Sequence, residues 1–317
     1  MLSGGSDVWE NRAVPYDIVV CVKQVPDTTN ITAEAMKEDG TVNRAALPAI
    51  FNPEDLNALE AALEVRDRYG GTVTAISMGP PKAAEVLRDC LYRGADRVIL
   101  ITDRRAAASD TLATSYILAQ TIRTIGRFDI VMCGRQAIDG DTAQVGPQIA
   151  EKLGIPQVTY LEKIDWIENG TARVRRNVGR GWEVVEVKLP VLFTVIGGAN
   201  QPRPPAAKKV MRYKRARIPA EIEAEVKTGL GQVSDEELLD AIERRKQELA
   251  RQGLLIEQWS LDDIHADLNR CGLLGSPTKV YRVQAIVLTK KGFTNIPPTE
   301  EGIRRLIDEL VVDRTLG

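Results

Sequence analysis

The sequence predicts an α/β fold: a mostly parallel twisted sheet with helices on both faces, plus a hairpin and an extended C-terminal arm. The first observation is a series of short, continuous apolar runs at 17–23, 72–77, 97–102 and 130–133. Such runs are typical of strands that are covered on both faces. The second observation is that helical segments with short connections separate the runs, which indicates parallel pairing through right-handed crossovers.

The predicted helices have residues at their ends that favour helix termini. Asn52 is predicted as the N-cap of the first helix, with Pro53 at its first position and Gly70 just after its end. Asp110 and Thr111 are predicted to cap the third helix. The helices expected in the first half of the chain are 53–69, 82–94, 111–126 and 142–153.

In the second half of the chain the pattern changes. Two stretches alternate in twos and predict an antiparallel hairpin with one solvent-facing side, 173–176 and 182–188. Residues 189–195 are expected to return to the central sheet. The segment 197–217, rich in Pro, Lys and Arg, is predicted to be an exposed extended loop. The remaining elements expected are a charged, largely solvated helix at 234–252, a strand-like run at 280–288 and a helix at about 299–311.

Composition excludes several classes of function. The 317 residues include 42 basic and 44 acidic side chains, so there is no overall field to attract nucleic acid or an acidic membrane. No apolar run approaches the roughly 20 residues that span a bilayer, and the N-terminus lacks the parts of a signal peptide. The basic run 208–217 has Tyr213 as its single aromatic, which favours a partner-facing loop over a nucleic-acid site.

Few side chains are suited to catalysis or metal binding. The four cysteines are scattered without a Cys-x-x-Cys pair, which favours buried thiols in a reducing compartment over disulfides or a metal site. His265 is the single histidine and is expected on a surface helix, so a zinc site or a Ser-His-Asp triad is hard to build. We expect no catalytic residue and no metal, and any redox chemistry then requires a cofactor.

Polar residues follow the predicted strands at the carboxyl edge of the sheet, where ligands bind in parallel sheets. Asn52 and Asp55, at the start of the first helix, are expected to face the same edge. The segments that converge there are 21–24, 78–80, 110–111 and 134–146.

The strand–loop–helix segment 133–147 carries the strongest signal of a site. Its helix is expected to begin near Thr142 and to direct backbone amides beyond the strand end, where α/β proteins bind nucleotide phosphates. Residues 140–146 and the Thr142 hydroxyl are expected to hold a phosphate. Asp139 and Asp141 would repel a diphosphate unless one caps the helix and the other turns away or meets a cation. The alternative is that Asp141 is only an N-cap and the glycines only form a turn.

Neighbouring residues leave further alternatives open. Arg135 is a candidate partner for a phosphate or an electron-rich ring, or else forms an ordinary surface salt bridge. A methionine such as Met78 after a strand more often packs than contacts a ligand. Because neither a G-x-G-x-x-G nor a G-x-x-x-x-G-K-[ST] motif is present, no standard Rossmann or P-loop site is predicted.

From Asp17 onward the chain resembles the β subunits of electron transfer flavoproteins. The matching stretches are Val20–Asp27, Asn52–Asp55, Met78–Pro81, Gly94–Asp96 and, highly specific to that family, Gly134–Thr142. The resemblance implies an adenine-nucleotide α-hydrolase-like sheet, an α subunit as obligate partner, and FAD or AMP in the β subunit. It implies cofactor contacts at Cys21, Asn52, Asp55, Met78, Asp110, Thr111, Thr114, Arg135, Gln136, Asp139, Gly140, Asp141, Thr142, Ala143, Gln144, Val145 and Gly146.

Arg135 and the runs 110–115 and 139–147 resemble the flavin-bifurcating branch of this family, in which a second FAD in the β subunit accepts a hydride from NADH. Gly140, where AMP-holding members have a carboxylate, reduces negative charge beside the diphosphate. Arg135 near the isoalloxazine would favour a reduced, anionic flavin. The resemblance thus implies electron transfer from NADH to ferredoxin and to a higher-potential acceptor such as quinone.

Two alternatives remain: a simple electron carrier that holds AMP, and a nucleotide sensor of the universal-stress type that transfers no electrons. Ala207 stands where the family's partner-docking loop usually has a leucine, which argues against the usual acyl-CoA dehydrogenase partners. We expect instead a larger complex with a further flavoprotein, quinone-reducing or a dehydrogenase, and an iron–sulfur subunit.

Three regions are expected along the chain. Residues 1–16 form a flexible N-terminal extension, and 17–227 form the nucleotide/flavin-binding α/β domain, which includes the partner loop 197–217. Residues 228–317 form a helical insertion and a C-terminal arm that packs on the α subunit. The expected location is the cytoplasm, or the inner face of the membrane through partner subunits, without direct membrane insertion.

Overall fold

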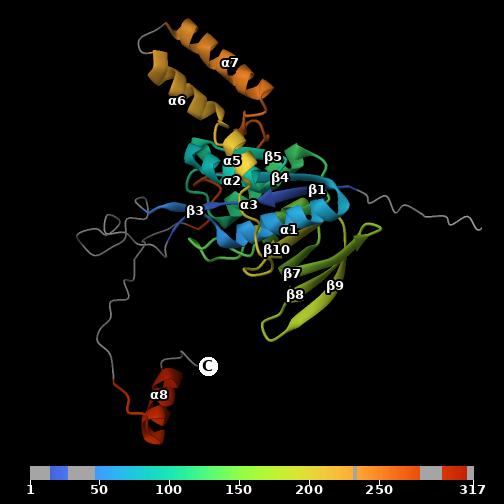
Figure 1. The fold of residues 1–317 in the computed structure, drawn as a ribbon, viewed down its shortest axis with the longest axis vertical. Helices are drawn as coiled ribbons and strands as arrows, with labels where there is room; N and C mark the ends of the chain where they lie inside the picture. Colours follow the sequence, from blue (N-terminus) through green and yellow to red (C-terminus); the bar gives the residue numbers. More distant parts are fainter. Residues whose placement is uncertain (1–14, 28–46, 231–233, 279–294, 313–317) are drawn as a thin grey trace, which may run out of the picture.

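A computed structural model describes residues 15–27, 47–230, 234–278 and 295–312 (Figure 1). Its centre is a nine-stranded sheet in the order β11-β5-β4-β1-β6-β10-β7-β8-β9, parallel up to β7 and antiparallel from β7 to β9. The strands are β1 Tyr16–Cys21, β4 Gly71–Met78, β5 Arg97–Ile101, β6 Ile130–Gly134, β7 Gln157–Glu168, β8 Thr171–Asn177, β9 Trp182–Lys188, β10 Val191–Val195 and β11 Glu257–Trp259. The predicted α/β class with a mostly parallel sheet is confirmed.

Helices cover both faces of the parallel part of the sheet. α1 (Pro53–Tyr69) and α2 (Ala84–Arg93) pack on one face, and α3 (Thr111–Ile125) and α4 (Val145–Leu153) pack on the other. The side chains of β1 show why its sequence is continuously apolar. Ile18 and Val20 enter the core under α1 and α2, whereas Val19 and Cys21 enter the core under α3 and α4.

The connections at the carboxyl edge place short elements beside the strand ends. β2 (Gln24–Pro26) pairs antiparallel with β3 (Ala49–Phe51), and this small sheet leads into α1. Single 3₁₀ turns lie after β4 and β5, at Pro81–Ala83 and Arg104–Ala106. α4 begins at Val145, three residues later than predicted, because Asp141 and Ala143 both have left-handed φ values of 52° that a helix excludes.

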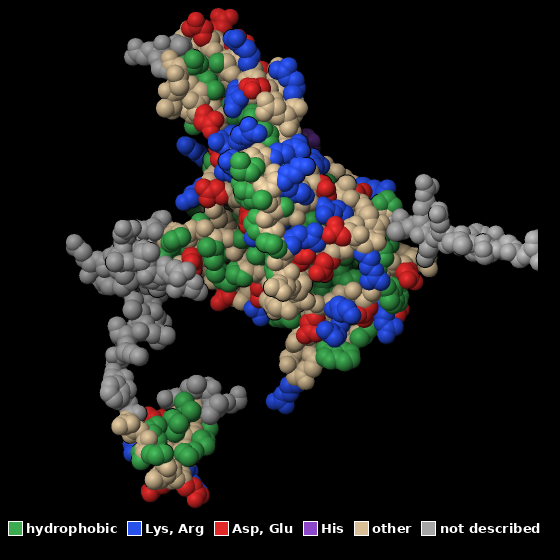
Figure 2. All heavy atoms as spheres, viewed as in Figure 1, with side chains coloured by type: hydrophobic (Ala, Val, Ile, Leu, Met, Phe, Trp, Pro, Cys, Tyr) green, Lys and Arg blue, Asp and Glu red, His purple; other side chains and the backbone are tan. Residues whose placement is uncertain are grey.

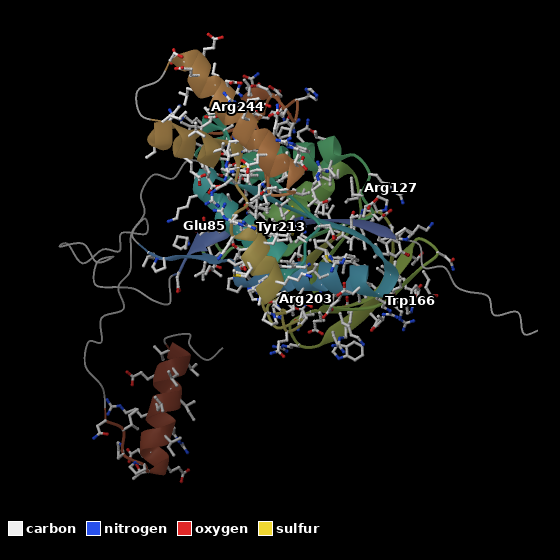
Figure 3. All side chains as sticks on the ribbon, turned by 45° about the horizontal axis from the view of Figure 1, so that its top comes forward. Glu85, Arg127, Trp166, Arg203, Tyr213 and Arg244 are labelled. Carbon is white, nitrogen blue, oxygen red and sulfur yellow. The ribbon has the colours of Figure 1, made fainter. Side chains whose placement is uncertain are left out.

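The segment 197–217 is not the extended loop that its composition predicts. It contains α5 (Ala207–Tyr213), and the Ala206 amide donates to the Tyr92 carbonyl of α2 at 3.0 Å. Arg203 donates from Nε to Glu60 of α1 at 2.9 Å and from Nη1 to Asp67 at 2.8 Å (Figure 3). These partners lie well over 100 residues earlier in the chain, so local composition gives no sign that the segment is anchored.

Lys and Arg side chains gather over α5 and the base of the helical hairpin that follows it (Figure 2). The hairpin consists of α6 (Pro219–Leu230) and α7 (Asp235–Arg251), whose N-terminus has a capping box between Ser234 and Glu237. α7 confirms the predicted charged helix, and two of its residues, Ile242 and Leu249, are buried.

The C-terminal segment returns to the sheet before it leaves again. β11 pairs parallel with β5, and a 3₁₀ turn at Leu268–Arg270 follows. α8 (Glu300–Val312) confirms the predicted final helix and stands apart from the sheet in Figure 1. The predicted boundary between the α/β domain and the C-terminal region, at residue 227, falls within α6. The division into domains stays a prediction. The strand-like run at 280–288 and residues 1–14 of the N-terminal extension lie outside the described residues.

Residues with reactive side chains lie in ordinary structural surroundings. All four cysteines are buried, and each is a free thiol that forms no disulfide. His265 is exposed, as predicted, but it lies in a turn with φ of 50° and not in a helix. Across the ranges that the structure covers, no group of three metal-ligating side chains comes together, and no helix is long and apolar enough to span a bilayer.

Candidate functional site

A cavity of about 410 Å³ opens at the carboxyl edge of the sheet, within the size range of small-molecule sites. The structure brings to its walls every predicted cofactor residue except Asn52 and Asp141. That these residues contact a nucleotide stays a prediction. Residues that also line the cavity but were not predicted as contacts are Val22, Lys23, Ala106, Ala108, Ser109, Leu118, Cys133, Gly134 and Ala137. Val22, Lys23, Gly134 and Ala137 lie inside the predicted segments 21–24 and 134–146. Ala106, Ala108, Ser109 and Cys133 lie within a few residues of the predicted segments 110–111 and 134–146, whereas Leu118 lies within α3 and had no such signal.

Asp55 ties together the ends of two neighbouring strands beneath the cavity. Its Oδ2 accepts from the Lys23 amide after β1 and its Oδ1 accepts from the Gly134 amide at the end of β6, both at 2.9 Å. Burial raises the pKa of this carboxyl to about 7, although these hydrogen bonds act in the opposite direction. Asp55 therefore fixes the floor of the site.

Asn52 stands at the N-cap position of α1, and its side chain supports the loop above this floor. Its side chain makes no cap hydrogen bond; Nδ2 donates to the Gln136 carbonyl at 2.9 Å and Oδ1 accepts from the Ile138 amide at 3.1 Å. Asn52 is the N-cap residue of α1, as predicted, but its side chain caps nothing because Oδ1 accepts from the Ile138 amide instead of an amide of the first turn. Asn52 is fully buried and acts through the loop.

Two glycines allow the chain to pass close to the strand ends. A Cβ on Gly134 would lie 2.5 Å from Asp55 Oδ1 and 2.7 Å from the Asp55 backbone nitrogen. A Cβ on Gly146, in the first turn of α4, would lie 2.7 Å from Cys133 Sγ and 2.8 Å from Thr194 Cγ2. The start of α4 therefore reaches the sheet edge because residue 146 has no side chain.

The two aspartates of the loop have partners that limit their repulsion of an anion. Lys23 Nζ donates to both carboxylate oxygens of Asp139 at 2.7 Å. Asp141 Oδ1 accepts from Gln136 Nε2 at 2.6 Å. Asp139 thus meets a cation, which is one of the conditions that a diphosphate site requires, and Asp141 is not the N-cap of α4.

The N-termini of α3 and α4 both border the cavity. Asp110 caps α3, since its Oδ1 accepts from the amides of Leu112 at 2.9 Å and Ala113 at 3.0 Å, as predicted. No side chain caps α4, whose N-cap is Gln144. The first-turn amides of α4 are therefore the donors available to an anion.

Arg135 lies on the cavity wall and carries an ion pair. Its Nη2 is 2.9 Å from Glu54 Oε1, and its guanidinium carbon lies 5.9 Å from the ring centre of Tyr160. Glu54 Oε2 also accepts from the Gln136 amide at 3.0 Å. The salt-bridge alternative for Arg135 is thus observed, although the residue still borders the cavity.

Comparison with known proteins assigns the family. The profile of the electron transfer flavoprotein domain matches residues 39–223. The electron transfer flavoprotein subunit beta of Clostridium acetobutylicum is 41% identical over 93% of this chain and 97% of its own length. This chain belongs to the electron transfer flavoprotein β-subunit family.

Other relatives extend the comparison within the family. Protein FixA of Bradyrhizobium diazoefficiens is 38% identical, over 93% of this chain and 91% of its own. The caffeyl-CoA reductase-Etf complex subunit CarD of Acetobacterium woodii is 41% identical, over 84% and 86%. Membership implies a flavin or AMP in the β subunit and pairing with an α subunit, so the resemblance inferred from the sequence is confirmed.

The cavity fits the nucleotide that this β-subunit family implies. The uncapped amides of α4 and the Thr142 side chain would hold the phosphate end, and the Lys23–Asp139 pair keeps the loop from presenting an uncompensated carboxylate. Gly140 has no heavy atom within 4 Å of an added Cβ, so the loop is open at that point. The electron-transfer group itself must come from the bound cofactor.

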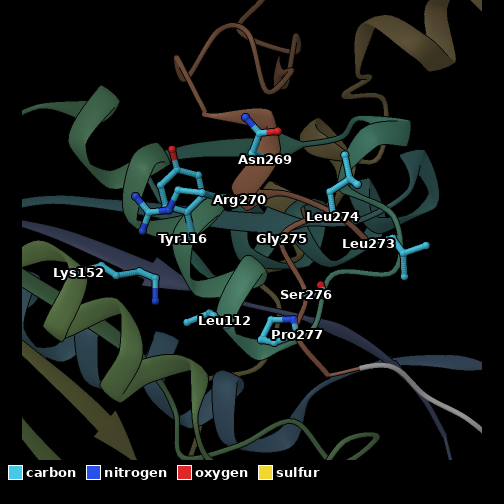
Figure 4. Close-up of a pocket in the computed structure, with 10 residues that line it drawn as sticks. All are labelled: Leu112, Tyr116, Lys152, Asn269, Arg270, Leu273, Leu274, Gly275, Ser276 and Pro277. Carbon is cyan, nitrogen blue, oxygen red and sulfur yellow. The ribbon is translucent and has the colours of Figure 1, made fainter.

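A second cavity, of about 600 Å³, lies on another side of the first turn of α3 (Figure 4). The Arg270 guanidinium lies 4.0 Å from the ring centre of Tyr116, and burial, followed by the charge of Arg270, lowers the pKa of Lys152. Leu273 and Leu274 are exposed at its rim. None of the predicted site residues lines this cavity, and no pattern in the sequence pointed to it.

Proposed function

We propose that this β subunit binds FAD in the carboxyl-edge cavity and, with its α subunit, transfers electrons from NADH to ferredoxin and to a higher-potential acceptor. NADH gives up a hydride, which is two electrons and one proton. One electron goes to ferredoxin, the other goes to the second acceptor, and the proton is released. FAD supplies the step from two-electron to one-electron chemistry, which no side chain of this protein provides.

The observation that carries the proposal is the uncapped start of α4 at a cavity whose aspartates are already paired. First-turn amides without a side-chain cap bind anions well, and Val145 and Gly146 supply two of them, since Pro147 in the same turn has no N–H. Asp139 has its negative charge balanced by Lys23 at 2.7 Å. The same cavity walls include Thr114 of α3, which offers a hydroxyl group to the cofactor, and Thr111, whose hydroxyl already donates to Gln144 Oε1 at 2.7 Å.

Two features favour FAD over AMP in this cavity. Gly140 stands where a carboxylate would add negative charge beside a diphosphate, and its surroundings are open. Arg135 lies on the cavity wall, where its guanidinium can face an electron-rich ring while it keeps its contact with Glu54. The alternative within the family, a simple carrier with AMP, needs neither feature.

A larger complex is the expected setting for this activity. The CarD relative is named as a subunit of a caffeyl-CoA reductase-Etf complex, which supports a further flavoprotein partner, either a dehydrogenase or a quinone reductase. The exposed cations Lys208, Arg212 and Lys214 on and just after α5 suit a surface that docks such a partner. We propose that the family's docking segment is used here without its usual leucine anchor.

The test is to count the nucleotides in the purified α/β complex. We expect denaturation to release two FAD and no AMP per heterodimer, and we expect NADH to bleach the visible flavin bands under anaerobic conditions. One FAD with one AMP would establish the simple carrier. A colourless complex would establish a nucleotide sensor, and flavins that NADH fails to bleach would remove NADH as the donor.

The Arg135–Glu54 pair provides a test specific to the FAD assignment. Arg135→Ala is expected to lower the reduction potential of the β-subunit flavin, because it removes a positive charge that favours the reduced anion. Glu54→Gln is expected to raise that potential, since it leaves the guanidinium without its counter-charge. Each shift should correspond to about 1 kcal/mol, the scale of one charge in a solvated site. Spectroelectrochemical titration measures both, and unchanged potentials would place Arg135 away from the flavin.

A further inference from the structure

The Lys23–Asp139 ion pair joins the end of β1 to the phosphate-binding loop. Lys23 Nζ lies 2.7 Å from both Oδ1 and Oδ2 of Asp139. The Lys23 side chain is 47% exposed and that of Asp139 is 23% exposed, and both residues line the cavity. The pair therefore borders the space that the nucleotide would fill, and solvent reaches it.

Hydrogen bonds fix the backbone of Lys23, whereas its side chain is partly exposed to solvent. Its amide donates to Asp55 Oδ2 at 2.9 Å, and its carbonyl accepts from the Asn52 amide at 3.0 Å. An ammonium group has three donors, and the contacts with Asp139 use two of them. One donor remains for an anion in the cavity without loss of the contact with Asp139.

We infer that Lys23 is the charge-compensating residue of the nucleotide site, with its ammonium placed between Asp139 and the nucleotide phosphate. In this role it sets the affinity of the site for anions, and it allows a loop that carries a carboxylate to accept a phosphate. The inference rests on the proposed nucleotide site. It does not depend on the choice between FAD and AMP or on NADH as donor.

The other charged side chains on the cavity wall already form ion pairs or hydrogen bonds with other protein groups. Among the described lining residues the second cation is Arg135, and Glu54 holds its guanidinium at 2.9 Å. Asp110 uses one carboxylate oxygen to cap α3 and the other to accept from the Thr278 amide at 3.0 Å. Asp55 is buried beneath the cavity. Within the described part of the chain, Lys23 is thus the lining cation whose side chain pairs with a residue of the phosphate loop itself.

A charge cycle on the α/β heterodimer tests the role, with AMP and adenosine as probes after the bound nucleotide is removed by dialysis. Lys23→Gln is expected to weaken AMP binding by about tenfold to a hundredfold, the usual loss of a charged hydrogen bond, and to leave adenosine unchanged. Asp139→Asn should tighten AMP binding about threefold to tenfold, because it removes a like charge near the phosphate. The double variant should lie between the two single variants.

Two further variants control for folding and for charge alone. Lys23→Arg keeps the positive charge and should keep most of the AMP affinity. Lys163→Gln removes an exposed lysine whose partner, Asp165 at 3.3 Å, lies on the same strand β7, away from the cavity. It should change neither AMP nor adenosine binding. Because both controls retain the rest of the site, they separate a general loss of stability from a loss of phosphate recognition.

Several results would overturn the inference. Equal weakening of AMP and adenosine by Lys23→Gln would show that Lys23 only holds the loop in place. Weaker AMP binding in Asp139→Asn would show that the ion pair is a structural latch. A wild-type heterodimer that binds neither probe would remove the nucleotide site together with this role. The count of FAD and AMP per heterodimer tests the proposed function separately, since the charge cycle gives the same result with either native nucleotide.

Discussion

The helices α3 and α4 begin at the same sheet edge, yet they treat their first-turn amides differently. Asp110 caps α3 with hydrogen bonds of 2.9 and 3.0 Å. α4 begins after Gln144, whose φ of −97° and ψ of −31° are helical and whose side chain caps nothing. α3 therefore satisfies its own donors, whereas α4 leaves donors for a ligand. One edge of the sheet thus contains both a capped helix start and an uncapped one, and we propose the uncapped one as the anion site.

The capped helix also holds the uncapped one in place. Thr111 Oγ1 donates to Gln144 Oε1 at 2.7 Å, and Ser115 Oγ donates to Gln148 Oε1 at 2.9 Å. These contacts join the first turns of α3 to the start of α4. The capped start of α3 therefore helps to hold the uncapped start of α4 in position.

The largest expected effect comes from moving the start of α4 away from the sheet. Gly146→Ala adds a Cβ that would lie 2.7 Å from Cys133 Sγ and 2.8 Å from Thr194 Cγ2, so we expect a loss of about 1–3 kcal/mol in unfolding free energy and of bound nucleotide. Gly181→Ala, between β8 and β9 and outside the cavity lining, is the matched control, because its Cβ would meet nothing within 4 Å. Thermal unfolding and the nucleotide content of the purified heterodimer measure both effects. Full nucleotide content in Gly146→Ala would contradict this account of the loop.

A smaller effect is expected from giving α4 the kind of cap that α3 has. Gln144→Asp places a carboxylate at the N-cap of α4, where it can occupy the amides and repel a phosphate. We expect AMP or FAD affinity to fall more than about tenfold, while the nucleotide-free protein gains about 0.5–1 kcal/mol. Gln144→Asn is the control for a cap without charge and should lose less affinity. Titration calorimetry decides, and an unchanged affinity would place the phosphate elsewhere.

A pH-dependent effect concerns the two aspartates that hold backbone amides at this edge. Burial raises the pKa of Asp55 to about 7 from its usual 3.8, so between about pH 4 and 7 the folded protein keeps a proton that the unfolded chain has lost. The stability that Asp55 contributes is present at low pH and is lost as the pH rises through this window, with a slope of up to about 1.4 kcal/mol per pH unit. Denaturant unfolding of wild type and Asp55→Asn from pH 4 to 8 measures the difference. Parallel curves would contradict it.

Asp110 should show the opposite dependence. Burial acts to raise its pKa, but hydrogen bonds from the amides of Ala113, Thr278 and Leu112 outweigh it and hold the pKa below the usual value. The stability from Asp110 is therefore present above about pH 4 and is lost as the pH falls through its folded pKa. Asp110→Asn should remove this loss at low pH, which the same unfolding series measures.

Most residues at the carboxyl edge of the sheet could be predicted, because strand ends and helix caps are marked by patterns of neighbouring residues in the sequence. The continuous apolar runs gave β1, β4, β5 and β6, and the order of these parallel strands brings residues 21–23, 78 and 134–146 to one cavity. Asp110 was predicted to be a cap from its position alone and is one. Three features could not be predicted: the start of α4, the loop-supporting role of Asn52, and the cation that pairs with Asp139.

The sequence by itself determined the strands β1, β4, β5, β6, β8, β9 and β10, most of the helices and the family, because period, caps and the 134–142 motif are properties of neighbouring residues. Only the tertiary structure decided which charges meet. Lys23 and Asp139 are 116 residues apart, Arg203 and Glu60 are 143 apart, and β11 joins β5 from the far end of the chain. Such contacts form because packed elements bring distant segments together. The local sequence pattern around each residue therefore cannot reveal which distant residue it will contact.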